Sequence, residues 1–102
     1  MTTQAFQVLL SLADGAKHGY AIIQDVGERT DGQLRLTAST LYDALARMVD
    51  QGLIAEVEAP ADNADSRRRY YQLTRAGREA AREHAQKLAR TVDMARAKKL
   101  LR

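Results

Sequence analysis

The C-terminal stretch, residues 74–102, contains no proline and, after Gly77, no glycine. Because these two residue types most often end helices, the stretch predicts one helix, capped by Thr74. At about 1.5 Å per residue, a fully helical stretch would be more than about 40 Å long. A chain of 102 residues fits one domain with a modest core. That core is too small to cover such a helix, so we expect its far end to meet a partner.

Two helices are predicted before residue 32. Residues 4–13 carry apolar side chains nearly all round a helix, so both of its faces favour burial. Asp14 and Gly15 stop this helix, and a second one opens at His18 and Gly19. Its inward stripe is predicted to be Tyr20, Ile22, Ile23 and Val26. We interpret His18 as a helix-start or packing residue in preference to a ligand or a proton switch.

A third helix is predicted to begin at the hydroxyl-rich residues 37–40 and to end at Gly52. Leu41, Leu45 and Met48 recur at i, i+4 and i+7 and should face the core. The side chains left outside are Ser39, Tyr42, Asp43, Ala46, Arg47 and Asp50.

A β-hairpin should follow the third helix. Residues 53–58 predict a strand with Leu53, Ala55 and Val57 on one face, and residues 68–73 predict a second with Tyr71 and Leu73 inward. Turn-forming residues 59–66 separate them. Helix, helix, helix, hairpin and long helix is the order of a winged helix-turn-helix, in which the third helix enters a DNA major groove. The predicted fold class is therefore α+β, mostly α, with residues 1–76 as the DNA-binding domain and residues 77–102 as a C-terminal dimerisation helix.

Three motifs in this order resemble the PadR family of prokaryotic winged-helix regulators. They are His18-Gly19-Tyr20-Ala21-Ile22; Leu36-Thr37-Ala38-Ser39-Thr40-Leu41-Tyr42-Asp43-Ala44-Leu45 followed by Gly52-Leu53-Ile54; and Arg69-Tyr70-Tyr71-Gln72-Leu73-Thr74-Arg75-Ala76-Gly77. The resemblance runs from about Leu9 to Gly77, and the single C-terminal helix is similar to the family's short subgroup. Many members carry Pro-Gly where this chain has Ala38 and Ser39. The resemblance implies a dimeric, operator-binding repressor that carries out no chemistry.

The expected DNA-binding residues come from the third helix and the hairpin. Hydroxyls and N–H groups at a helix start suit phosphate oxygens, and arginines at the wing can reach phosphates or a minor groove. The set is Thr37, Ala38, Ser39, Thr40, Tyr42, Arg47, Arg67 and Arg68. The alternatives are capping for the hydroxyls, a half-buried position for the tyrosine and a solvated charge run for the arginines. Asp43 is left unassigned, because phosphates would repel it.

Charge is divided unevenly along the chain. Residues 1–60 hold four basic and eight acidic side chains, whereas residues 61–102 hold twelve basic and five acidic ones. A basic half indicates a polyanion partner such as double-stranded DNA, although a solvated helix face would give the same composition.

Small and apolar residues form a narrow seam along the last predicted helix, at spacings of three, four and seven. A seam of this width suits one partner helix, and the first helix also needs a second surface. A twofold homodimer satisfies both, with packing on the chain's own domain as the alternative. The expected interface residues are Phe6, Leu9, Ala81, Ala85, Leu88, Val92 and Ala95. The resemblance to drug- and phenolic-acid-responsive members also allows a small apolar effector at this interface.

Other classes of protein find little support. The chain has no cysteine and no nucleotide-binding or hydrolase motif, so we expect no enzyme, no cofactor and no metal site. The N-terminal apolar run is too short for a signal peptide or a membrane span, and we expect a cytoplasmic protein. The rival interpretation is a winged-helix protein-interaction module that binds no operator.

Overall fold

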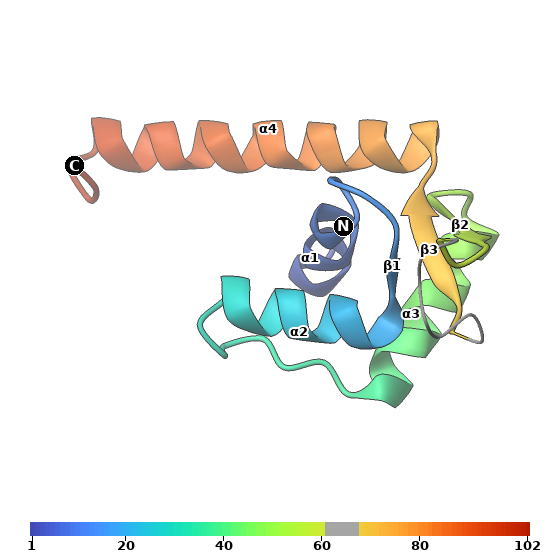
Figure 1. Cartoon of the computed structure of the whole chain (residues 1–102). Coiled ribbons are helices and arrows are strands. Elements are labelled where there is room, and N and C mark those ends of the chain that lie inside the picture. Colours follow the sequence, from blue (N-terminus) through green and yellow to red (C-terminus); the bar gives the residue numbers. More distant parts are fainter. Residues whose placement is uncertain (61–67) are drawn as a thin grey trace.

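The computed structural model describes residues 1–60 and 68–102, and within them the expected order of elements is confirmed, with one short additional strand. The elements are α1 (Thr3–Ser11), β1 (Lys17–His18), α2 (Gly19–Arg29), α3 (Ala38–Asp50), β2 (Ile54–Val57), β3 (Tyr70–Leu73) and α4 (Arg75–Ala97). Figure 1 shows α1, α2 and α3 gathered on one side, the strands beside α3, and α4 lying across α1. The predicted fold class is therefore correct: mostly helical, with a small sheet and a long last helix.

Each helix begins at a residue whose side chain accepts a backbone N–H of the first turn. Thr2 accepts from Ala5, His18 from Ala21, Thr37 from Thr40, and Thr74 from Gly77. These caps fix the helix starts that the sequence predicted at His18, Thr37 and Thr74. Gly52 follows α3 with φ of +74°, a conformation in which a side chain would be strained.

The core lies between α1, α2, α3 and the sheet. Its residues are Val8, Leu9, Leu12, Ile22, Val26, Leu36, Leu41, Ala44, Leu45, Met48, Ile54 and Tyr71. The predicted core face of α3 is confirmed. Tyr20, expected in the inward stripe of α2, is instead 57% exposed. It stands two residues before Ile22, and two residues on a helix point to nearly opposite sides.

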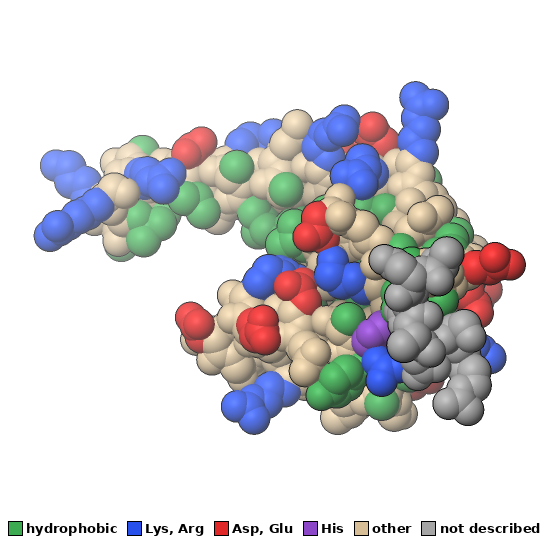
Figure 2. Space-filling model, viewed as in Figure 1, with side chains coloured by type: hydrophobic (Ala, Val, Ile, Leu, Met, Phe, Trp, Pro, Cys, Tyr) green, Lys and Arg blue, Asp and Glu red, His purple; other side chains and the backbone are tan. Residues whose placement is uncertain are grey.

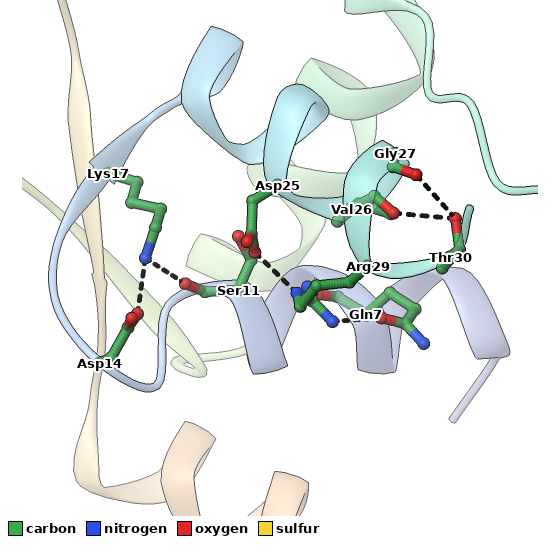
Figure 3. A network of polar contacts seen from close by, with 9 residues as sticks. All are labelled: Gln7, Ser11, Asp14, Lys17, Asp25, Val26, Gly27, Arg29 and Thr30. Carbon is green, nitrogen blue, oxygen red and sulfur yellow. Dashed lines mark hydrogen bonds and ion pairs between the residues drawn. The ribbon is translucent and has the colours of Figure 1, made fainter. Parts of the chain in front are cut away.

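Polar contacts join α1 to α2 beneath α4 (Figure 3). The Arg29 guanidinium pairs with Asp25 at 2.9 Å and donates to the side-chain and backbone oxygens of Gln7 at 2.7 and 3.1 Å. Lys17 donates to the Ser11 carbonyl and pairs with Asp14, both at 2.6 Å. These contacts hold the turn between α1 and β1 and set the position of α2 on α1.

The antiparallel sheet has the strand order β1-β3-β2, and His18 and Val57 both pair with Tyr70. Strand β1 was not predicted, since two residues give no periodic pattern. The predicted face of β2 is wrong: Ile54 is buried, whereas Leu53, Ala55 and Val57 are half-buried. The strand begins one residue later than expected, and its first side chain points into the core. Tyr71 and Leu73 do face the core, as expected.

In the described part of the chain, helix α4 contacts the domain through its N-terminal half. The Thr74 hydroxyl donates to the Gly52 carbonyl, and the Thr74 N–H to the Leu53 carbonyl. The far end of α4 extends past the other helices (Figure 1). The helix has 23 residues, about 34 Å, and stops before the predicted end because Lys99 adopts a positive φ. The molecule is consequently elongated, 50 × 28 × 25 Å.

Candidate nucleic-acid interface

The N-terminal turn of α3 is exposed and already capped. Thr37 Oγ1 accepts from the Thr40 N–H at 3.1 Å and donates to the Thr40 hydroxyl at 2.9 Å. Ala38 and Ser39 are exposed beside this pair. Thr37 therefore caps α3, as the alternative interpretation of these hydroxyls expected. Ser39 is a further exposed hydroxyl residue on the same turn.

Tyr42 lies one turn further along α3 and borders a recess of about 350 Å³. The recess is lined by His18, Gly19, Tyr20, Tyr42, Arg68 and Arg69. The Tyr42 side chain is 45% exposed and lies against the start of α2. Three parts of the chain that are distant in sequence, namely the starts of α2, α3 and β3, thus meet at one surface. We call these six residues the recess cluster.

His18 organises the recess cluster from the side of α2. Its Nδ1 accepts from the Ala21 N–H at 3.1 Å, which confirms its interpretation as a helix-start residue. The His18 ring packs edge-on against Tyr70 at 5.3 Å and parallel to Tyr20 at 6.5 Å between centroids. One residue therefore joins the cap of α2 to the central strand of the sheet.

Arg68 closes the recess from the side of the hairpin. Its Nη1 lies 3.0 Å from His18 Nε2, and its guanidinium carbon lies 5.9 Å from the centroid of the Tyr20 ring. A guanidinium held against two aromatic rings loses freedom of movement. Arg68 is thus placed beside Tyr42, as a wing arginine needs to be if both are to contact one nucleic acid.

The hairpin residues that follow Arg68 make contacts within the sheet. Arg69 forms an ion pair with Glu56 across the sheet at 3.7 Å. Burial, and then the charge of Glu56, raise the pKa of the Tyr71 hydroxyl beneath them, so this phenol stays neutral. Arg67, which we also expected at the interface, lies outside the described residues.

Arg47 is separate from the recess cluster. It stands near the C-terminal end of α3, where it borders a different pocket, of about 390 Å³, against the start of α1. The structure therefore brings Ser39, Tyr42 and Arg68 onto neighbouring surfaces and leaves Arg47 apart from them. Sequence reasoning missed Gly19 and Tyr20, although the His18-Gly19-Tyr20 motif contained the signal.

The seam predicted for dimerisation divides into two parts. Leu9 is completely buried in its own domain, so its assignment to an interface is wrong: it has no surface to offer a partner. Phe6 is 8% exposed and packs on the His84 ring of α4 at 4.8 Å between centroids, and Ala81 packs on the core. Further along α4, Ala85 is exposed, Leu88 is 45% exposed, and Val92 and Ala95 are half-buried.

The outer part of α4 is amphipathic. Figure 2 shows lysine and arginine side chains along its outer side and tip, and hydrophobic side chains on the side that faces the domain. Leu88 at 45% and Met94 at 62% are among its exposed apolar side chains. None of the helices in the described part of the chain combines the length and the apolarity needed to cross a bilayer.

The third of the three packed helices begins with a capped, exposed turn, and a hairpin arginine lies beside that turn. This arrangement defines a winged helix-turn-helix protein. Residues 8–83 match the model of the transcriptional regulator PadR-like family, and the chain belongs to this family. It is accordingly a transcriptional regulator and not an enzyme.

Similar solved structures include two regulators of about the same length. A PadR-like regulator from Bacillus cereus superposes with a TM-score of 0.81 at 17% identity, covering 97% of this chain and 93% of that one. A PadR family regulator from hypervirulent Clostridium difficile gives a TM-score of 0.76 at 24% identity, with coverage of 91% and 94%. These likenesses show the shared fold.

Two further relatives are longer than this chain. Bacillus subtilis PadR in complex with operator DNA gives a TM-score of 0.70 at 20% identity, covering 82% of this chain and 47% of that one. A 37.1 kDa protein of a Streptomyces fradiae transposon is 41% identical over 83 residues, which are 81% of this chain. The chain spans only 22% of that curated relative's length.

Proposed function

We propose that this chain is a sequence-specific DNA-binding regulator that acts in the cytoplasm as a homodimeric repressor. Residues 1–76 would form the DNA-binding unit, and residues 77–102 the dimerisation helix. The observation that carries the proposal is the recess cluster, which places Tyr42 of α3 and Arg68 of the hairpin beside the exposed start of α3.

The DNA contact follows from how these groups lie. Ser39 and Ala38 are exposed on the first turn of α3, the part that enters a major groove in helix-turn-helix proteins. Tyr42 and Arg68 flank this turn and suit phosphate oxygens. Bacillus subtilis PadR, which has a similar fold, was solved with operator DNA, and we extend that partner to this chain.

The homodimer rests on the unpartnered part of α4. Ala85, Leu88, Val92 and Ala95 lie at helical spacing beyond His84, the residue of α4 that packs on Phe6. A second α4 laid along this face would bury them. A dimer whose third helices lie about one DNA turn apart, roughly 34 Å, covers a pseudo-palindromic operator and blocks a promoter. A small apolar effector at this interface is part of the same proposal.

Selection of bound sequences from a random double-stranded pool tests the function. The wild type should enrich a motif with twofold symmetry. Ser39→Ala should relax one position in each half-site by about 1 to 3 kcal/mol. Tyr42→Phe should keep the motif and weaken binding by about 0.5 to 3 kcal/mol, as expected for a lost phosphate contact.

Two results would contradict the proposal. The first is a wild type that enriches no symmetric motif, which would favour the protein-interaction module. The second is wild-type affinity and an unchanged motif in both variants, which would remove α3 from the interface.

A further inference from the structure

The Tyr42 ring approaches the backbone of Gly19 more closely than any other residue would allow. A Cβ atom built on Gly19 would lie 2.6 Å from the Tyr42 hydroxyl oxygen, 2.9 Å from Cζ and 3.3 Å from Cε1. Ordinary van der Waals contact begins near 3.5 Å, so even a methyl group has no room there. The outer edge of the Tyr42 ring occupies the space that a side chain at residue 19 would need.

Backbone conformation does not account for a glycine at this position. Gly19 is the first residue of α2 and is buried, and the glycines with positive φ are Gly15, Gly32 and Gly52. Alanine favours a helix more than glycine does. Close approach by Tyr42 is therefore the physical reason for glycine at residue 19.

We infer that Gly19 is a positioning residue for DNA binding, because it sets where the Tyr42 hydroxyl lies. The inference rests on the proposed function and extends it from α3 to α2. Tyr42 is 45% exposed, and the outer edge of its ring lies against Gly19. This contact holds the Tyr42 hydroxyl beside Arg68 within the recess cluster, where the two groups can contact one phosphate.

Gly19→Ala tests this role. The atoms in the way belong to the outer end of a partly exposed side chain, so the fold should persist while the hydroxyl moves by roughly 1 Å. Affinity for the selected operator should fall about tenfold, the size expected for a lost hydrogen bond. Gly27→Ala is the matched control: it lies in the same helix, and a Cβ there meets nothing within 4 Å. It should bind DNA as the wild type does.

A double-mutant cycle separates positioning from a general defect of α2. In the Tyr42→Ala background no ring remains to be displaced, so adding Gly19→Ala should cause no further loss. A Gly19→Ala loss that persists at full size in that background, or a Gly19→Ala protein that binds as tightly as the wild type, would overturn the inference.

A measurement without DNA completes the test. In NMR spectra, the Tyr42 ring protons should show contacts to the Gly19 α-protons, and their signals should shift in Gly19→Ala but not in Gly27→Ala. Unshifted Tyr42 signals in Gly19→Ala would also overturn the inference. A wild type that enriches no DNA motif contradicts the proposed function, whereas a wild type that binds and a Gly19→Ala protein that binds equally well contradict only the positioning role.

Discussion

At the scale of single residues, the recess cluster shows how few side chains join the elements around α3. His18 caps α2 through Nδ1 and contacts Tyr70 of β3 with its ring. Arg68 lies against His18 and Tyr20. The sequence indicated the cap and the arginine but placed Tyr20 inside, because the helical period alone does not say where the stripe begins. Gly19 was missed because the motif contains the glycine but does not say which side chain approaches its backbone.

Removing the Arg68 charge should weaken DNA binding without changing sequence preference. We expect Arg68→Ala to lower the slope of log affinity against log salt by about 0.9 for its one phosphate contact. Arg82→Ala is the control, since Arg82 lies on α4 and pairs with Glu79. Binding titrations at several salt concentrations measure both slopes. Equal slopes for Arg68→Ala and the wild type would show that Arg68 contacts no phosphate.

The ion pair between Asp25 and Arg29 should make stability depend on pH. Partial burial works to raise the pKa of the Asp25 carboxyl, but the Ser11 hydroxyl beside it, then the hydrogen bond and charge of Arg29, outweigh burial, so the pKa lies below its ordinary 3.8. A lowered folded-state pKa adds stability above pH 4 that is lost as pH falls through the folded pKa. Asp25→Asn should reduce the free energy of unfolding by about 0.5 to 1 kcal/mol at pH 7, and by less near pH 3.

Urea unfolding at both pH values measures this difference. Asp43→Asn, at an exposed carboxylate on α3, provides the comparison. A deficit in Asp25→Asn that is as large at pH 3 as at pH 7 would show that the charge of Asp25 is not its cause.

At the scale of elements, the sequence predicted helices better than strands. All four helices were found, and the starts of α2, α3 and α4 followed from their capping residues. Strand β2 was assigned the wrong inward face because four residues give too few alternations to fix a register. The end of α4 was placed too late, since nothing in its composition announces the positive φ of Lys99.

The junction of α4 with the hairpin should tolerate no side chain at residue 77. A Cβ on Gly77 would overlap the Leu53 carbonyl oxygen, which belongs to the backbone and cannot rotate away. Gly77→Ala should therefore lower the free energy of unfolding by about 1 to 3 kcal/mol, the range for overpacked sites. Gly27→Ala, with open space around it, should lower it by nothing. Thermal or urea unfolding compares the two, and equal stability would mean that α4 can shift on the hairpin at no cost.

At the scale of the whole molecule, the elongated shape comes from a helix that its own domain covers only at one end. The contacts of α4 with α1 and the strands lie near its start, through Gly77, Ala81 and His84. Sequence alone could predict that such a helix projects, from its length against a modest core. It could not divide the seam into an inner part, which this domain buries, and an outer part beginning at Ala85.

A charge on the outer seam should prevent dimerisation. We expect Leu88→Glu to be monomeric, because the proposed interface would have to bury an unpaired carboxylate. Gln86→Glu adds the same charge to an exposed position two residues away and should stay dimeric. Sedimentation velocity measures both. A wild type that is monomeric at high concentration, or a dimeric Leu88→Glu protein, would contradict the proposed dimer.

The close packing of Gly77 against Leu53 limits the spacing that the two half-sites of a palindromic operator can have. Because α4 begins against the backbone of Leu53, α4 and the hairpin would rotate as one unit. The paired α4 helices of a dimer would then hold the two DNA-binding domains at one fixed angle. One base pair inserted between half-sites rotates the second by about 35° around the duplex axis. Because α4 cannot rotate freely on the hairpin, the rotation between the two half-sites around the duplex would have to match the protein as strictly as their base sequence does.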